Sequence, residues 1–197
     1  MKTLLTAAAL LALLAAIALG ALYGGAYDVA ATSPETGVVA WALETAQERS
    51  VARRARAVEV PPLDRPELRA VGLIHYHEMC VTCHGAPGVP ASEIGAGLNP
   101  FPPELAEEAE EYGPAELFWM VKNGIKMTGM PAFGPTHTDE ELWAIVAFVE
   151  SLPEMSGADY AAAVRAAGLA GLAGEAAEPP GAPGEEHSDT HRDPHDH

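Results

Sequence analysis

The hydrophobic pattern opens with an apolar run from Leu4 to Tyr27, which contains no charged residue and follows Lys2. Because the core of a bilayer takes about 20 apolar residues in a helix, the run predicts a transmembrane helix within residues 1–31. Lys2 favours an inside N-terminus with the rest of the chain on the outer face. A cleaved signal peptide is the alternative, with small residues before Tyr27 and after Ala31 as cleavage sites. Cleavable segments are usually shorter, so the anchor is favoured.

The next segment, VVAWALETAQERSVARRARAV, has the pattern of an amphipathic helix. Ser33 is the expected cap, and Pro34 is suited to the first helical position. The prolines of VPPLDRP then end the helix, so residues 32–65 are predicted to form a connecting helix and a linker. The arginines and Trp41 suit contact with lipid headgroups or a partner protein, but nothing in the pattern is specific. A solvated connecting helix is the favoured interpretation.

Helical periodicity returns at Pro66 in PELRAVGLIHYHEMC, which leads directly into Cys80. A glycine- and proline-rich stretch, Gly85 to Pro103, follows and is predicted to be a long loop. PAELFWMVKNG then predicts a short helix from Pro114 to a stop at Gly124.

The last strong helical pattern is THTDEELWAIVAFVESLP, in which Thr138 and Glu141 form a capping box and Pro153 ends the helix. Leu142, Ile145, Val146 and Val149 form its expected buried stripe. No strand of alternating pattern is evident, so the fold is predicted to be all-α. Residues 66–155 are its expected folded domain.

Residues 156–197 begin with a possible short helix, ADYAAAVRAAG, and end in a segment of proline, glycine and charge that predicts a disordered tail. The tail histidines suit weak binding of a divalent metal; they are His187, His191, His195 and His197. The chain has 28 acidic against 11 basic residues and a formal charge of −17, which argues against nucleic acid binding.

The chain contains only two cysteines, and they lie three positions apart in the motif C-x-x-C-H. At this spacing Cys80 and Cys83 can form thioethers with the two vinyl groups of one haem, while His84 coordinates the iron from the same turn. The motif therefore predicts a single, covalently attached haem c.

Three alternatives fit the same motif less well. A structural zinc site requires four ligands, and His75, His77 or His137 would have to supply those that are missing. A thioredoxin-like dithiol requires strands that the pattern does not predict. A disulfide would close a very short loop and would give His84 no role.

A six-coordinate haem requires a second axial ligand, and a thioether raises its reduction potential relative to a second imidazole. Met130, between Gly129 and Pro131, is the first candidate. Met127 is second and suits core filling as well. His137 is third, whereas His75 and His77 are predicted to lie on the exposed side of the helix before Cys80.

Residues Pro66 to Pro153 resemble the class I c-type cytochromes. GLIHYHEMCVTCHG is similar to the first helix and haem-binding turn of that family, GMPAFG to its methionine loop and DEELWAIVAFVESLP to its last helix. The resemblance implies a small helical domain around one haem, with Met130 as axial ligand. It also implies contacts of Gly72 and Tyr76 with Trp143 and Phe148, and a backbone carbonyl that holds the His84 N–H, for which Pro100 is the candidate.

The predicted function is one-electron transfer by a membrane-tethered monohaem cytochrome in a respiratory or related chain, with its haem domain in the periplasm. The protein is predicted not to be an enzyme. Its expected partners are membrane-bound redox proteins, with no small-molecule substrate and no nucleic acid. One alternative is the cytochrome subunit of a larger membrane dehydrogenase, oxidase or reductase. A second is a haem sensor or enzyme with an open distal site, which requires that Met130 does not bind the iron.

Overall fold

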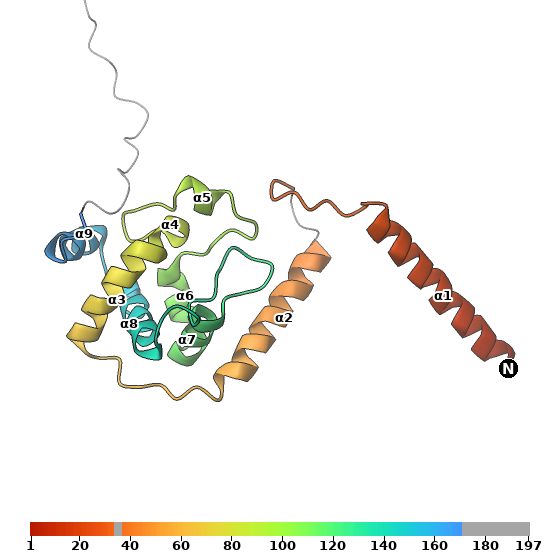
Figure 1. Cartoon of the computed structure of the whole chain (residues 1–197), viewed down its shortest axis with the longest axis horizontal. Coiled ribbons are helices and arrows are strands. Elements are labelled where there is room, and N and C mark those ends of the chain that lie inside the picture. Colours follow the sequence, from red (N-terminus) through yellow and green to blue (C-terminus); the bar gives the residue numbers. More distant parts are fainter. Residues whose placement is uncertain (34–36, 171–197) are drawn as a thin grey trace, which may run out of the picture.

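The computed structural model describes residues 1–33 and 37–170 (Figure 1). Within these ranges every regular element is a helix, apart from one isolated bridge between Ala86 and Val89, which confirms the all-α prediction. The helices are α1 Lys2–Tyr23, α2 Gly37–Ala55, α3 Pro66–Met79, α4 Val81–His84, α5 Glu93–Ala96, α6 Leu105–Glu111, α7 Pro114–Asn123, α8 Asp139–Val149, the 3₁₀ helix η1 Leu152–Glu154 and α9 Gly157–Ala166.

Helix α1 extends away from the rest of the molecule (Figure 1). It is 22 residues long, its most apolar window has a mean hydropathy of 2.5, and none of that window is buried. Such a helix is long and apolar enough to cross a membrane, and an N-terminal signal sequence has the same properties. The predicted first helical position at Pro34 and the predicted tail after residue 170 lie outside the described residues.

The folded body is organised around the packing of α3 against α8. A Cβ atom at Gly72 would lie 1.9 Å from the carbonyl oxygen of Ala144, so only glycine allows the two helices to approach this closely. The rings of Tyr76 and Phe148 pack beside this contact, with centroids 5.1 Å apart. Trp143 was expected in the same contact, but its aromatic partner is Phe118 of α7, on which it stacks at 4.1 Å.

Helix α8 lies at the centre of the core and is buried on all sides. Every residue from Leu142 to Val149 is buried, which is more than the four-residue stripe that the sequence predicted. The capping box at its start is confirmed: the Thr138 N–H donates to Glu141 Oε2 at 2.7 Å, and the Glu141 N–H donates to Thr138 Oγ1. Helix α7 begins at Pro114 and ends before Gly124, also as predicted.

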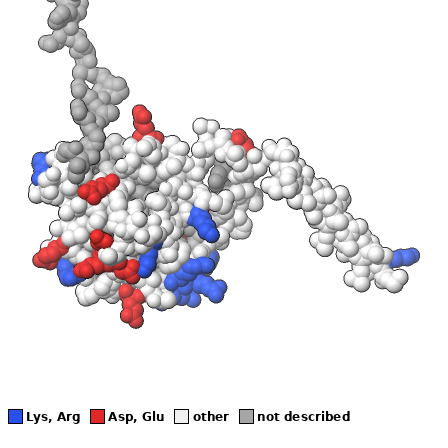
Figure 2. All heavy atoms as spheres, in the orientation of Figure 1, with Lys and Arg blue, Asp and Glu red and all other residues white. Residues whose placement is uncertain are grey.

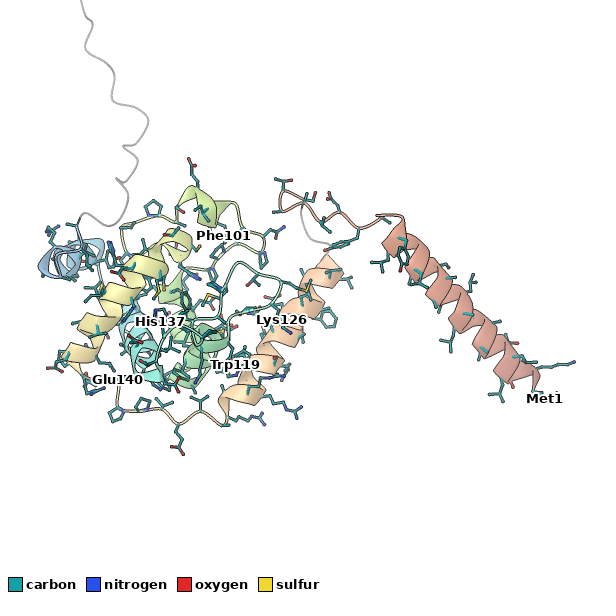
Figure 3. The ribbon with its side chains drawn as sticks, viewed as in Figure 1. Met1, Phe101, Trp119, Lys126, His137 and Glu140 are labelled. Carbon is teal, nitrogen blue, oxygen red and sulfur yellow. The ribbon has the colours of Figure 1, made fainter. Side chains whose placement is uncertain are left out.

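The second half of α2 packs against α7, so the expectation of a solvated connecting helix is wrong for this half. Val51 and Ala55 are buried in the contact. The guanidinium of Arg54 lies over the ring of Trp119, 5.9 Å from its centroid. Figure 3 shows Trp119 beside α2. The first half of α2 leaves Trp41 exposed.

The possible helix after residue 156 is confirmed as α9, which joins the core through Tyr160 and Val164. The Tyr160 hydroxyl forms a 2.8 Å hydrogen bond with Nδ1 of His77 on α3. His77 is only 8% exposed, so the prediction that it lies on the exposed side of α3 is wrong. The pairing partner that buries it lies 83 residues away, where helical periodicity gives no information.

Candidate functional site

Cys80 joins α3 to α4, and Cys83 and His84 lie in the single turn of α4. The N–H groups of Cys83 and His84 both donate to the carbonyl oxygen of Cys80, at 3.1 and 2.9 Å. Both cysteines are free thiols in the structure, so no disulfide closes this turn. The three side chains therefore belong to one rigid segment, which continues directly from α3.

The environment of the cysteines does not favour zinc. Cys80 is 8% exposed. Burial, with a smaller contribution from Cys83, raises the pKa of its thiol to about 12. Residues 1–33 and 37–170 also contain no group of three or more His, Cys, Asp or Glu side chains placed to hold a metal ion.

His84 is held in one orientation by its backbone partner. Its Nδ1 lies 2.8 Å from the carbonyl oxygen of Pro103. Because a carbonyl can only accept, Nδ1 carries the proton and Nε2 keeps a free lone pair, the arrangement that suits a metal ligand. Burial lowers the pKa of His84, which further favours the neutral imidazole. The predicted partner, Pro100, is wrong by three residues, because α5 and the turn after it determine where this loop returns to His84.

The loop that returns to His84 is held by local contacts near the cysteines. Ser92 donates through Oγ to the carbonyl oxygen of Thr82 at 2.7 Å, and the same Oγ accepts from the Ile94 N–H and so caps α5. A Cβ atom at Gly95 would lie 2.6 Å from the carbonyl oxygen of Cys83. The segment predicted as continuous loop thus contains a short helix that packs directly on the cysteine turn.

The methionine loop between α7 and α8 is closed by its own hydrogen bonds. The Met130 N–H donates to Thr128 Oγ1 at 3.0 Å, and the Ile125 N–H donates to the Met130 carbonyl oxygen at 3.2 Å. Met130 is half-buried. Met127 is 81% exposed with a φ of 62°, so its alternative prediction as core filling is wrong.

The two loops touch each other. A Cβ atom at Gly129 would lie 2.5 Å from Cδ1 of Leu98, so the methionine loop lies against the segment that continues to Pro103. The structure therefore brings the neighbour of Met130 against the same loop that holds His84.

The remaining histidine candidates have other partners. His137 packs its ring edge-on against His75 and Phe133, and its Nδ1 lies 2.9 Å from Thr136 Oγ1. His77 is bound to Tyr160 through Nδ1, while its buried Nε2 has no hydrogen-bond partner among the described residues.

Sequence reasoning missed Pro103, Ser92 and Thr128, which orient the candidate ligands or their loops. Thr128 had a recognisable signal, since a threonine two residues before a loop position commonly accepts the backbone N–H of that position. The contact of Pro103 with His84 has no local signal, because 19 residues separate the two.

This set of side chains fits a covalent haem. It contains two thiols not joined to each other, an imidazole with a free Nε2 and a half-buried thioether on a loop packed against the histidine's loop. Residues 69–149 match the family model described as cytochrome C oxidase, cbb3-type, subunit III. This match supports a c-type cytochrome domain over these residues, a family that implies covalently bound haem c and haem-based electron transfer. Comparison with curated proteins and with solved structures gave no match.

Proposed function

We propose that the protein is a membrane-anchored monohaem cytochrome that carries single electrons between redox proteins of a respiratory or related chain. The observation that carries the proposal is the Cys80–His84 turn, with the His84 ring oriented by Pro103. In this proposal residues 1–31 are the anchor, residues 32–65 the connecting segment, residues 66–155 the haem domain in the periplasm, and residues 156–197 a C-terminal extension.

Each residue of the site has a defined role in the proposal. Cys80 and Cys83 would hold a covalent haem through thioethers, and His84 would bind its iron through Nε2. Met130 would supply a thioether to the same iron and so keep small molecules from it. Bound haem supplies an iron centre that takes up and releases one electron. Pro103 keeps the proton on Nδ1 of His84, and the loop bond from Met130 N–H to Thr128 limits where the thioether can move. No bond is made or broken in a substrate.

A second candidate function is the cytochrome subunit of a larger membrane complex. The observation in its favour is the similarity of residues 69–149 to subunit III of cbb3-type cytochrome c oxidases. In this case α1 serves both as an anchor and as a helix that packs in the membrane part of the complex. Native electrophoresis of membranes dissolved in mild detergent separates the two functions, because a subunit migrates with its partners and a tethered carrier migrates alone.

The experiment that tests the proposed function is haem staining of the denatured full-length protein, expressed in a host that attaches haem c. We expect the wild type to keep its haem through denaturation. Cys80→Ala and Cys83→Ala should each weaken or abolish the stain. Thr82→Ala, an exposed change between the two cysteines, is the matched control and should keep it. Loss of haem from the denatured wild type would contradict covalent attachment.

The same samples test the anchor. We expect the stained protein to stay in the membrane pellet after an alkaline wash, with a mass that includes residues 1–31. A soluble stained protein that lacks these residues would instead identify the segment as a cleaved signal peptide.

A further inference from the structure

The outward side of the second half of α2 carries a stripe of arginines. Arg49 and Arg53 on the helix and Arg56 directly after it follow the i, i+4, i+7 spacing, which places them on one side. Val51 and Ala55 face the opposite way and are buried against the domain. All three arginines are exposed. The packing of α2 thus fixes this stripe toward the outside.

The stripe is unusual in so acidic a protein. The chain has a formal charge of −17, yet none of the three arginines forms an ion pair in the part of the chain that the structure describes. Two other cations there are paired, Arg69 with Asp64 and Lys122 with Asp139. Figure 2 shows a positive patch over the end of α2, with most of the visible negative charge on the other side of the same view.

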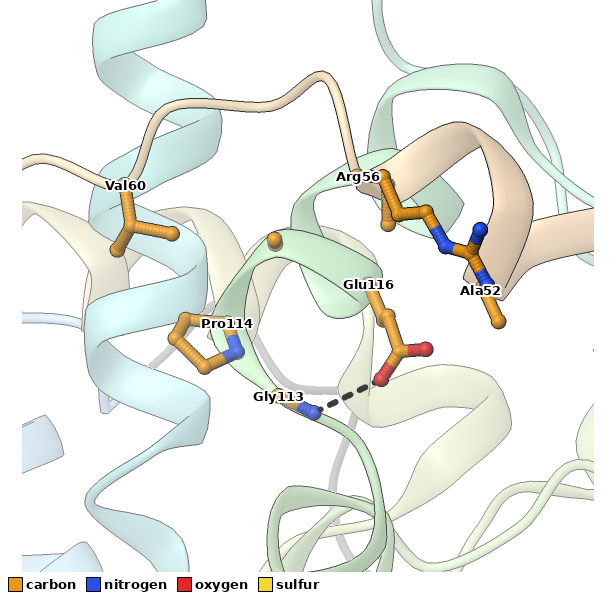
Figure 4. Close-up of a pocket in the computed structure, with 8 residues that line it drawn as sticks. Ala52, Arg56, Val60, Gly113, Pro114 and Glu116 are labelled. Atoms are coloured by element: carbon orange, nitrogen blue, oxygen red, sulfur yellow. Dashed lines mark hydrogen bonds between the residues drawn. The ribbon is translucent and has the colours of Figure 1, made fainter.

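An apolar hollow adjoins the stripe (Figure 4). It has a volume of about 260 Å³ and lies between the end of α2 and the start of α7. Its apolar walls come from both elements, and Arg56 and Glu116 stand at its border; the wall residues are Ala52, Ala55, Val60, Pro114 and Ala115. Glu116 is engaged by the N–H of Gly113 at 3.2 Å, which leaves Arg56 as the polar group at the border without a partner among the described residues.

The position of the stripe favours a protein over a lipid surface. Arg49 lies 12 residues after Gly37, which is about 18 Å along the helix from the end that follows the membrane segment. Helices that lie on membranes place large apolar residues beside their basic ones. Here Val51 and Ala55 are inside the domain, whereas the exposed Val38 and Trp41 are at the opposite end of α2.

We propose that Arg49, Arg53, Arg56 and the adjoining hollow form a docking surface for an acidic protein partner that inserts one apolar side chain into the hollow. Lys126, in the loop that carries Met130, is also exposed and lies on the side of the domain where α2 is drawn (Figure 3). A partner docked here is attracted toward that loop by charge. The identity of this partner as an electron donor or acceptor rests on the proposed function; the surface itself does not.

The test uses the full chain in neutral phosphatidylcholine nanodiscs, titrated with a fluorescein-labelled polyglutamate peptide that carries one central phenylalanine. We expect binding that weakens about tenfold or more in Arg49→Gln/Arg53→Gln/Arg56→Gln, since each exposed pair contributes up to about 1 kcal/mol. Arg65→Gln/Arg69→Gln/Arg165→Gln removes the same charge elsewhere and should change binding less than twofold. The wild type should bind a peptide with serine in place of phenylalanine more weakly than the phenylalanine peptide. Val60→Asp, which places a charge in the apolar wall of the hollow, should bind the two peptides equally.

Three results would overturn the proposal: no binding of the peptide, equal losses in the two triple variants, or hydrogen-exchange protection of residues 49–56 that appears in the wild type when phosphatidylglycerol is added to the nanodiscs. The last result would assign the stripe to anionic lipid. Haem content is read from the visible spectrum of the same samples. A protein that binds the peptide but lacks haem c would contradict the proposed function and leave the docking surface standing. A protein that contains haem c but does not bind the peptide would contradict the docking surface and leave the proposed function standing.

Discussion

The α3–α8 contact and the two loops that carry the candidate ligands are held in different ways. The contact is formed by buried apolar surface, with Gly72 against Ala144 and Tyr76 against Phe148. The loops have few buried side chains and depend on single hydrogen bonds, such as Ser92 to Thr82. Mutations in the contact should therefore unfold the domain, whereas mutations in the loops should change local order first.

The change with the largest expected effect breaks the contact itself. Gly72→Ala places a Cβ atom 1.9 Å from a backbone oxygen of α8, and neither helix can move without disturbing the core. We expect the free energy of unfolding to fall by about 2–3 kcal/mol, measured by urea denaturation. Gly37→Ala, in open space on α2, is the control and should change it by less than about 0.5 kcal/mol. Equal effects of the two changes would mean that the close approach is unimportant.

Tyr160→Phe tests how firmly α9 is attached to α3. The change leaves Nδ1 of His77 without its partner, in a ring whose Nε2 already has none among the described residues. We expect a loss of about 1–2 kcal/mol in urea denaturation, because a buried polar group loses its only hydrogen bond. Tyr27→Phe, at an exposed position outside the folded body, should be neutral. A neutral Tyr160→Phe would show that apolar contacts alone hold α9.

Ser92→Ala tests the loop before His84 separately from the α3–α8 contact. It removes the N-cap of α5 and the bond to the Thr82 carbonyl. We expect a cost of about 1 kcal/mol that appears as faster hydrogen exchange at Ile94, with little change at Val146 in the core. Glu93→Gln is the adjacent control. If exchange increased equally in the loop and in α8, the loop would belong to the same cooperative unit as the contact.

The smallest expected effect concerns acid pH. The hydrogen bonds from Thr138 hold the pKa of Glu141 below its ordinary value. A carboxyl with a lowered pKa in the folded state contributes stability above its unfolded value, and this contribution is lost as pH falls below about 4.5. Glu141→Gln should therefore flatten the acid side of the stability profile. Glu140→Gln, in the same turn but without the capping contact, should leave that side unchanged.

The sequence predicted those features that depend on neighbouring residues and missed those that depend on residues distant in the chain. Periodicity and caps predicted α3, α7 and α8, because Pro66, Pro114 and Thr138 act on neighbouring residues. The motif also predicted which side chains share the cysteine turn. Burial of His77 and of half of α2 was missed, since both depend on partners distant in sequence.

Within the site, the carbonyl predicted to hold His84 was that of Pro100, whereas the structure has that of Pro103, and the cause is similar. The carbonyl that reaches His84 depends on the path of the whole preceding loop, including α5. Local pattern could identify the loop as rich in turn residues but could not determine which of its carbonyls faces the ring.

The measurement that tests the central claim most directly is the visible spectrum of the full-length protein in its oxidised and reduced forms. We predict sharp reduced bands of haem c and, in the ferric form, the weak far-red band of methionine bound to iron. Met130→Ala should remove the far-red band and allow carbon monoxide to bind the reduced form, while Met127→Ala should change neither. A far-red band that persists in Met130→Ala, or its absence from the wild type, would contradict the assignment of Met130, and a protein without haem bands would contradict the account as a whole.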